Sequence, residues 1–538
     1  MMNLRSVAAA ALLVVLTFCA LVCAQDAPTI KWKRATCFGN ELQYCETGWY
    51  SSAAVVEDGA QSAIFVSSYH VYRLDSNGNE VWKVEVAADV SDPDGGVSSR
   101  TWPGVVLCDL LGNGQLAVVT AHGEGYVSAY DLDGNFLDGW PKRPFNNELR
   151  SLAVGDLENN GGALQVAVGV ARGDDINMSV LDADGDERSG WPQRQDSTEG
   201  YSWGIYSDNL AFADVVPGGS LEIIAPSDVH YVQVYTLDGE PVPASDYYGD
   251  RMWGEVGFYT DPALELLGYG PCSSENDVWR ANFARGSAVV ADVDGDGTDE
   301  IILTGNVHDC SDNQADEFVT VFIVNKDRTR WTNANYDWTT VPLSTGAPAN
   351  QNIESVIWSA VVADLDNDGE LEILFPSYDG RLHCFWLDQE EKHAWPIQVP
   401  GGGFRYASEP VVVDIDNDGF SEIIFGTWTR RGSGDVGELV MVNYRGEVLH
   451  RVPIDANDDW DGLMATPTIA NIDGDADLEV VVLSVDSGVY AFDLPNSANA
   501  RVQWGTARGS RYRSGKVGPV SADPPSSGPG PSPSPSPS

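Results

Sequence analysis

Short apolar runs separated by polar turns recur along most of the chain. One copy reads LAVGD (152–156), VAVG (166–169) and MSVL (178–181), followed by an Asp184-Gly185 turn and a closing Gly190-Trp191-Pro192. Runs of four to six residues that are rich in Val, Ile and Phe and bounded by Gly, Asn and Asp predict β-strands. The pattern therefore predicts an all-β chain built from a repeated unit of short strands, without a convincing helical period after residue 24.

The repeated unit occurs eight times. Its first apolar run begins near Ala53, Gly104, Leu152, Leu210, Ala288, Ala360, Val411 and Thr466. Four short strands in a unit of about 50 residues are typical of a β-propeller blade. A β-sandwich array is the alternative, but closing the units into a ring hides the sheet edges that an open array exposes. We predict a single β-propeller of four-stranded blades over residues 25–516. The repeat count favours eight blades, or seven if the degenerate first unit instead completes the last blade.

The last four units carry acidic loops with a common spacing. Oxygen-bearing side chains recur at positions 1, 3, 5 and 9, and Gly usually occupies position 6. Calcium takes about six to eight oxygen ligands, which such a loop supplies together with the backbone carbonyl at position 7. An acidic, solvated turn is the alternative, which four copies with one spacing disfavour. The predicted metal positions are Asp292, Asp294, Asp296, Thr298 and Glu300; Asp364, Asp366, Asp368, Glu370 and Glu372; Asp414, Asp416, Asp418, Phe420 and Glu422; and Asn471, Asp473, Asp475, Asp477 and Glu479.

These loops are not EF-hands, because position 12 is an apolar residue inside a predicted strand rather than a bidentate Glu between helices. We expect each ion in the hairpin between the first two strands of a blade. Together, the loops and the repeat resemble the FG-GAP and VCBS-type repeats of integrin α-chain propellers and their exported relatives, over residues 53–504. The resemblance implies about four bound Ca²⁺ ions, which we interpret as structural. The complete Phe-Gly and Gly-Ala-Pro consensus is absent, so the likeness is to the looser VCBS-like repeats.

Three earlier units carry eroded versions of the same loop. The loops that begin at Asp109 and Asp214 have no carboxylate at position 3, and the loop that begins at Asp156 is intermediate. Whether these three loops bind ions is open at this point.

The charge of the chain excludes two classes of partner. Its 538 residues include 80 Asp and Glu against 31 Lys and Arg, which gives a formal net charge of −49. Nucleic acids and acidic membrane surfaces are bound by clustered Lys and Arg, so we expect neither as a partner. Bound calcium would offset part of this excess negative charge.

The two ends of the chain differ from the repeats. Residues 1–24 combine Arg5 with an apolar run from 7 to 22, which predicts a cleaved secretory signal; an uncleaved membrane anchor is the alternative. Residues 517–538 are rich in Pro and Ser, which predicts a disordered tail. The tail resembles the Ser-Pro repeats of green-algal and plant hydroxyproline-rich wall proteins. With the glycosylation sequon at Asn177, these features predict a secreted glycoprotein of a cell wall or matrix, without membrane insertion after cleavage.

Six cysteines remain after cleavage of the signal, and an even number suits the disulfides of an exported protein. Two pairs each lie within one loop region, and we expect them to bridge: Cys37 with Cys45, and Cys272 with Cys310. Cys108 and Cys384 lie in apolar, strand-like runs, so we expect buried free thiols there.

No catalytic motif accompanies the repeats. The seven histidines lack the spacing of a zinc-binding helix, and the nucleophile elbow, phosphate loop and dinucleotide fingerprint are absent. Two long insertions, 241–285 and 307–355, hold aromatic residues that either bind sugars or proteins at the surface or pack against the ring. These residues are Tyr247, Tyr248, Trp253, Phe258, Tyr259, Tyr269, Trp279, Trp331, Tyr336 and Trp338.

Three functions remain open from the sequence. The first is a non-enzymatic, secreted, calcium-binding propeller that recognises an extracellular protein or polysaccharide, as the integrin-like resemblance implies. The second is a lyase-like enzyme that acts on polysaccharides, which needs a base and a charge-neutralising cation beside the sugar. The third is a structural module whose tail links it to a glycoprotein network. The oligomeric state is left open.

Overall fold

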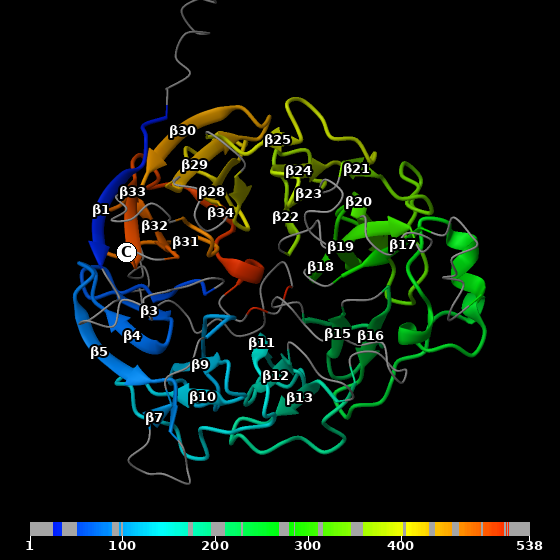
Figure 1. Ribbon diagram of the computed structural model, residues 1–538, viewed down its shortest axis with the longest axis horizontal. Helices are drawn as coiled ribbons and strands as arrows, with labels where there is room; N and C mark the ends of the chain where they lie inside the picture. Colours follow the sequence, from blue (N-terminus) through cyan, green and yellow to red (C-terminus); the bar gives the residue numbers. More distant parts are fainter. Residues whose placement is uncertain are drawn as a thin grey trace, which may run out of the picture.

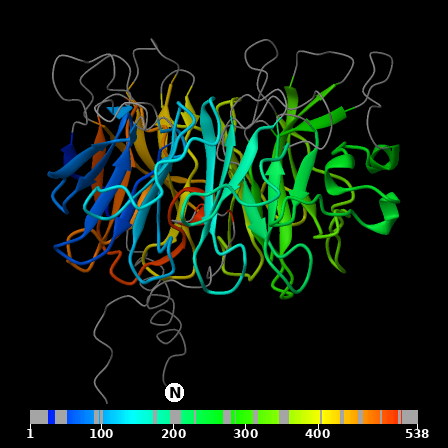
Figure 2. The same ribbon diagram turned by 90° about the horizontal axis from the view of Figure 1, so that it is seen from below.

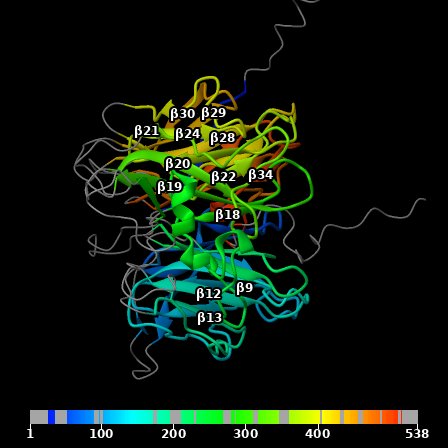
Figure 3. The ribbon, with the colours of Figure 1, turned by 90° about the vertical axis from the view of Figure 1, so that its right-hand side faces the viewer.

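The computed structural model is an all-β ring of eight blades (Figure 1). It describes residues 25–34, 51–88, 96–97, 101–170, 176–194, 210–227, 230–267, 279–283, 286–309, 316–345, 359–401, 405–429, 436–454, 462–485, 488–510, 513 and 515. The blades follow one another around the ring in sequence order, and the side views show them standing next to each other (Figures 2 and 3). Both the propeller and the count of eight blades are therefore confirmed.

Each blade is a small antiparallel sheet whose first strand lies nearest the central channel. Blades 1 and 2 contain β2 (Ala54–Val56), β3 (Ala63–Ser67), β4 (His70–Leu74) and β5 (Glu80–Glu85), then β8 (Val105–Cys108), β9 (Ala117–Ala121) and β10 (Val127–Tyr130). Blades 3 and 4 contain β11 (Leu149–Gly155), β12 (Gln165–Val170) and β13 (Met178–Leu181), then β14 (Ala211–Ala213), β15 (Glu222–Pro226) and β16 (Val232–Tyr235). Isolated bridges extend blades 2 to 4 toward a fourth strand.

The second half of the ring has more complete sheets. Blades 5 and 6 contain β17 (Trp279–Asn282), β18 (Ala288–Ala291), β19 (Glu300–Asp309), β20 (Asp316–Val324) and β21 (Ser344–Thr345), then β22 (Val361–Ala363), β23 (Glu372–Pro376), β24 (Arg381–Phe385) and β25 (Ile397–Gln398). Blade 7 contains β26 (Tyr406–Ala407), β27 (Val411–Asp414), β28 (Glu422–Trp428), β29 (Glu438–Asn443) and β30 (Val448–Pro453). Blade 8 contains β31 (Thr468–Ala470), β32 (Leu478–Leu483) and β33 (Val489–Leu494).

The hydrophobic core is a series of layers between neighbouring blades. One layer joins blades 1 and 2 through Phe65 and Leu107, and another joins blades 8 and 1 through Val481 and Ile64, all fully buried. Strands with apolar residues on both faces suit this arrangement, because each sheet is covered by a neighbour on either side. The continuous Val and Ile runs of the sequence therefore become strands buried on both faces.

Tryptophan side chains link seven of the eight pairs of neighbouring blades by one repeated hydrogen bond. In blade 2, the Trp140 indole N–H donates to the Ala183 carbonyl in the turn of blade 3, at 3.0 Å. The same bond, at 2.8 to 3.1 Å, is made by Trp32, Trp82, Trp191, Trp253, Trp338 and Trp395. The closing Trp of the sequence repeat is therefore a clamp between blades. Within the described residues, no tryptophan makes this bond from blade 7 to blade 8.

The ring is closed by the strand that precedes the first repeat. Strand β1 (Thr29–Arg34) pairs with β33 and forms the outer edge of blade 8, where the blue and orange strands lie side by side in Figure 1. The first repeat forms a blade of its own, so the seven-blade alternative is wrong. A separate segment, rather than the first repeat, completes the last blade.

The segment after blade 8 enters the central channel. Strand β34 (Arg501–Trp504) pairs with β27 of blade 7, and the 3₁₀ turn η5 (Ala507–Gly509) follows near the middle of the ring (Figure 1). The fully buried Arg508 donates from Nη1 to the Ala288 carbonyl of blade 5, at 2.9 Å, and from Nη2 to the Leu210 carbonyl beside blade 4. The described residues of the segment 501–515 therefore occupy the channel and contact residues in or beside most of the blades.

The described part of the long insertions mostly packs against the ring. Trp253, Phe258 and Trp338 are fully buried, whereas 63% of the Tyr247 surface is exposed. Three short 3₁₀ turns build the first insertion: η2 (Asp246–Tyr248), η3 (Trp253–Glu255) and η4 (Pro262–Leu267). Packing, the second of the two predicted roles, holds for most of these aromatic residues. None of the helices in the described residues is long and apolar enough to cross a membrane.

Several of the predictions concern single residues and can be compared with the structure. Cys108 and Cys384 are buried and belong to no disulfide, as expected. Asn177 is fully buried, so the sequon does not present a surface side chain, contrary to its use as a glycosylation site. The signal, the tail, both predicted disulfides and Tyr269 lie outside the described residues.

Candidate metal centres

The four acidic loops occupy equivalent hairpins in blades 5 to 8. Each connects the first two strands of its blade: β18 to β19, β22 to β23, β27 to β28, and β31 to β32. This is the position that the sequence predicted. Because the first strand of every blade runs in the same direction along the channel, the four hairpins lie on the same face of the ring.

In each hairpin, three carboxylate oxygens from different residues lie within 4.8 Å of one another. The groups are Asp292, Asp294 and Glu300; Asp364, Asp366 and Glu372; Asp414, Asp416 and Asp418; and Asp473, Asp475 and Glu479. The remaining predicted positions stand outside these groups: Asp296, Thr298, Asp368, Glu370, Phe420, Glu422, Asn471 and Asp477. The spacing therefore identifies the hairpins and twelve of the carboxylates that converge in them.

The side chains at positions 1 and 9 organise the loop backbone. In blade 6, Asp364 accepts the N–H groups of Asp368 at 3.1 Å and Gly369 at 3.2 Å, and the buried Glu372 accepts the N–H of Leu365 at 2.7 Å. The loops of blades 5 and 7 repeat all three bonds. Gly369 has a φ of +92°, a left-handed conformation that favours glycine, and this explains the Gly at position 6.

One buried oxygen in blade 6 has no partner within the protein. Asp366 Oδ1 is buried and unpaired, although Oδ2 accepts the Trp386 indole N–H at 3.5 Å. A buried oxygen without a partner costs about 1–3 kcal/mol. The atoms of this loop that converge as possible metal ligands are all carboxylate oxygens, which a hard cation such as calcium prefers. The residues of this loop therefore fit a calcium ion.

The electrostatics of blades 5 to 7 also favour a cation. Burial, together with the neighbouring aspartates, raises the pKa of Glu300 to about 7, of Glu422 to about 8 and of Glu372 to about 9. Without a counter-charge, the like charges of each loop oppose the ionisation of its glutamate. A divalent cation would remove that opposition.

Neighbouring hairpins are joined by backbone hydrogen bonds. The Leu371 N–H of blade 6 donates to the Val293 carbonyl of blade 5 at 3.0 Å, and the Ser421 N–H of blade 7 donates to the Leu365 carbonyl at 2.9 Å. A cation that orders one hairpin would therefore also support the next hairpin around the ring.

The eroded loops keep the backbone frame but not the converging carboxylates. Asp109 accepts the N–H groups of Asn113 at 3.0 Å and Gly114 at 2.7 Å, and the buried Glu222 accepts the N–H of Val215 at 2.8 Å. Within the described residues, groups of three carboxylates occur in blades 5 to 8 and not in the loops at Asp109, Asp156 or Asp214. These loops are held by hydrogen bonds from backbone N–H groups to side-chain carboxylates.

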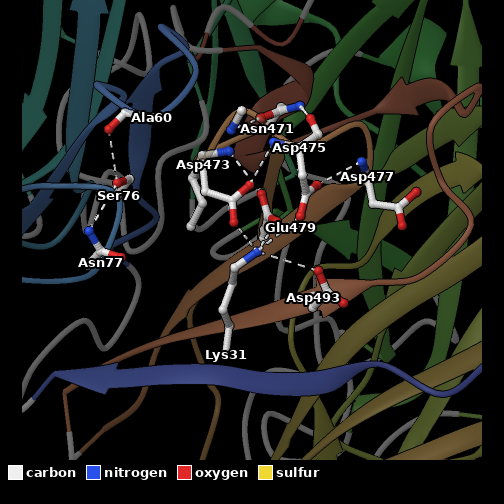
Figure 4. Close-up of polar contacts among 12 residues, drawn as sticks. Lys31, Ala60, Ser76, Asn77, Asn471, Asp473, Asp475, Asp477, Glu479 and Asp493 are labelled. Atoms are coloured by element: carbon white, nitrogen blue, oxygen red, sulfur yellow. Dashed lines mark hydrogen bonds and ion pairs between the residues drawn. The ribbon is translucent and has the colours of Figure 1, made fainter.

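The loop of blade 8 holds a residue that the sequence did not indicate. The Lys31 ammonium group, from the closing strand β1, points into the carboxylate group and contacts Asp473 and Glu479 (Figure 4). Lys31 lies 448 positions from Glu479 in the sequence. Asn in place of Asp at position 1, and Ala476 in place of Gly at position 6, were the only signals that this loop differs.

Comparisons with known proteins support the fold. Residues 364–425, which contain the loops of blades 6 and 7, match the FG-GAP-like repeat family. This match and the eight-bladed ring fit an FG-GAP-type propeller. No curated protein sequence matches the chain.

Solved structures share the fold at low sequence identity. Quinohemoprotein alcohol dehydrogenase from Comamonas testosteroni is 14% identical, with a TM-score of 0.50 over 87% of this chain and 76% of its own. BamB from Moraxella catarrhalis is 13% identical, with a TM-score of 0.43 over 83% of this chain and 94% of its own. The V. cholerae biofilm matrix protein Bap1 is 11% identical, with a TM-score of 0.39 over 89% and 93%. At this identity, the likeness to the alcohol dehydrogenase concerns the fold alone.

Proposed function

We propose that this protein is a secreted, calcium-stabilised propeller that binds an extracellular protein or polysaccharide and does not catalyse a reaction. The observation that carries the proposal is the trio of acidic hairpins on blades 5, 6 and 7. They converge carboxylates at equivalent places on consecutive blades, and backbone hydrogen bonds join them. A structural ion in each hairpin is the role that suits this placement.

Calcium would be held by the converging carboxylates of each hairpin: Asp292, Asp294 and Glu300 in blade 5; Asp364, Asp366 and Glu372 in blade 6; and Asp414, Asp416 and Asp418 in blade 7. The ion would offset the mutual repulsion of these carboxylates and connect the two inner strands of the blade. Binding to the folded state alone stabilises that state by mass action. The high negative charge of the chain increases the stabilisation that this counter-charge would provide.

Two features favour binding over catalysis. The described residues of the segment 501–515 occupy the central channel, with Arg508 and Trp504 fully buried, so a substrate would have to displace them to bind there. In addition, the buried acidic group of the first insertion is paired internally. The buried Glu265 accepts from Arg330 Nε at 3.0 Å and from the Tyr248 hydroxyl at 3.1 Å, so these side chains form a structural cluster.

The exposed part of the first insertion is the best-supported ligand surface. Tyr247 is 63% exposed and Leu267 is 62% exposed, on a segment that the buried Trp253 anchors to the ring. An exposed aromatic side chain on a rigid support suits stacking on a sugar or packing against a protein.

The proposal is tested by two measurements on the secreted chain. Thermal unfolding with calcium and then with excess chelator should show a fall in the midpoint; an unchanged midpoint would contradict calcium stabilisation. Binding to arrays of extracellular polysaccharides and proteins should weaken in Tyr247→Ala. If acidic polysaccharides instead release unsaturated products that absorb in the ultraviolet, the lyase-like alternative holds.

A further inference from the structure

We propose that Lys31 takes the place of the metal ion in the acidic loop of blade 8, so that the ring is closed by an internal ion pair instead of calcium. The chain would then bind three structural ions, although its sequence contains four acidic loops of the same spacing. Only the number of ions rests on the proposed calcium binding; the role of Lys31 in ring closure is independent of it.

The position of the ammonium group carries this inference. Lys31 Nζ lies 2.8 Å from Glu479 Oε1, 3.5 Å from Asp493 Oδ1 and 3.8 Å from Asp475 Oδ2, and it also contacts Asp473 Oδ2 (Figure 4). Three of these four carboxylates are the group that converges in the hairpin. A calcium ion would need the same oxygens at about 2.3–2.6 Å. The ammonium group and the metal therefore exclude each other.

The closing strand is shaped to deliver this side chain. In the pairing of β1 with β33, Ile30 lies opposite Phe492 and Trp32 lies opposite Ala491, so that Lys31 is the extra residue of a β-bulge. A bulge bends its strand and redirects a side chain. Here it directs Lys31 to the loop of blade 8, while the next residue, Trp32, clamps the strand to the Ser76 carbonyl of blade 1 at 3.0 Å.

The loop of blade 8 differs from the other three at positions 1 and 6, and the change at position 1 removes a carboxylate that could bind a metal ion. Its first residue is the amide Asn471, whose Nδ2 donates to the Asp475 carbonyl at 2.7 Å and whose Oδ1 accepts the Gly474 N–H at 3.0 Å. Position 6 is Ala476, and it does not take the left-handed φ seen at Gly297, Gly369 and Gly419. The position-1 side chain of blade 8 is thus an uncharged amide, and it contributes no carboxylate to the converging group.

The burial of the partners explains why the lysine matters. The Glu479 side chain is fully buried, whereas Lys31 is 24% exposed. A buried ionised carboxylate without a counter-charge is strongly destabilising, so a charged Glu479 needs a cation beside it. Lysine supplies it from the strand that closes the ring, and closure therefore does not depend on the external calcium concentration.

The number of bound calcium ions tests the assignment directly. We would measure calcium per chain by elemental analysis after dialysis of the full secreted protein. The expected count is three for the wild type, two for Asp366→Asn and three for Asp473→Asn, because the last loop holds no ion. A count of four that falls to three in Asp473→Asn would overturn the proposal. The double variant Lys31→Met/Asn471→Asp should gain one ion.

A count of zero in every variant would contradict the proposed calcium function without deciding the role of Lys31. That role is tested separately in chelator by hydrogen exchange of the amides of residues 29–34. Lys31→Met should speed their exchange at least about tenfold. The matched control is Lys33→Met, which removes an equal charge from the same strand, where Lys33 lies over the Tyr490 ring. Equal exchange in wild type, Lys31→Met and Lys33→Met would overturn the proposal.

Discussion

The hairpins of blades 5 to 7 and the hairpin of blade 8 share one sequence spacing, but among the described residues only blade 8 has a lysine ammonium group beside its converging carboxylates. Blade 7 has a longer contact, from Arg501 Nε to Asp414 Oδ2 at 3.8 Å. In blades 5 to 7, burial and neighbouring aspartates raise the pKa of the position-9 glutamates Glu300, Glu372 and Glu422 to between about 7 and about 9.

In blade 8, burial also raises the pKa of the position-9 residue Glu479. The difference lies at position 3: burial raises the pKa of Asp366 and Asp416, whereas the hydrogen bond from Lys31 brings the pKa of Asp473 below its ordinary value despite burial. The comparison teaches that loops of one acidic spacing can differ in the charges that surround them, so the spacing alone does not specify a metal ion.

Removal of calcium should produce the largest effect. With excess chelator, we expect the unfolding midpoint of the wild type to fall by on the order of 10 °C, since three loops lose their counter-ions together. Calorimetry at constant ionic strength measures this change, and restored calcium should reverse it. An unchanged midpoint would show that the hairpins of blades 5 to 7, like the hairpin of blade 8, do not depend on calcium.

Neutralising one glutamate should change the free energy of unfolding by different amounts in the two regions. In chelator, Glu479→Gln removes a buried partner of Lys31 and should cost about 1–3 kcal/mol of unfolding free energy. Glu372→Gln should cost less than about 1 kcal/mol at pH 8, because the charges beside that glutamate are all negative and a Gln Oε1 can still accept the Leu365 N–H. Denaturant unfolding of the pair measures both values, and a similar loss in both variants would remove the distinction.

The pH dependence of the calcium-free protein should separate the regions further. The folded-state pKa of Glu372 is about 9 against an ordinary value of 4.5, because of burial and then Asp366, Asp368 and Asp364. A raised acid pKa means that the stability is complete below about pH 4.5 and declines as the pH rises to about 9. We expect the midpoint in chelator to fall over this range, and less steeply in Glu372→Gln. A midpoint that rises with pH would contradict the assignment.

Restoring the consensus residue in blade 8 should have the smallest effect. Asn471→Asp alone should bind no further ion, because Lys31 still occupies the loop, and it should change the unfolding free energy by less than about 1 kcal/mol through the lost hydrogen bond to the Asp475 carbonyl. Titration calorimetry with calcium checks the ion number. A newly gained site in this single variant would show that Asn471, rather than Lys31, excludes the metal.

Local patterns along the chain were sufficient to predict much of the fold. The apolar runs from Ala53 to Thr466 predicted the eight innermost strands, and the acidic spacing placed four loops in the correct hairpins. Both features depend on residues that are close in sequence, such as Asp364 and Leu365. A short loop is sufficient to bring such residues together with their partners. The closing Trp residues were visible as a pattern, but their hydrogen bonds to the next blade were not.

The sequence by itself determined the repeated blade and the convergence of carboxylates within each hairpin, and it favoured eight blades over seven, because strand propensity and loop geometry act over a few residues. Only the tertiary structure decided how the ring closes, what fills its channel and which cation neutralises the last loop. These features join Lys31 to Glu479, and Arg508 to Leu210, across 448 and 298 positions. Contacts at such separations are set by how the blades pack around the ring, and no local pattern in the chain records them.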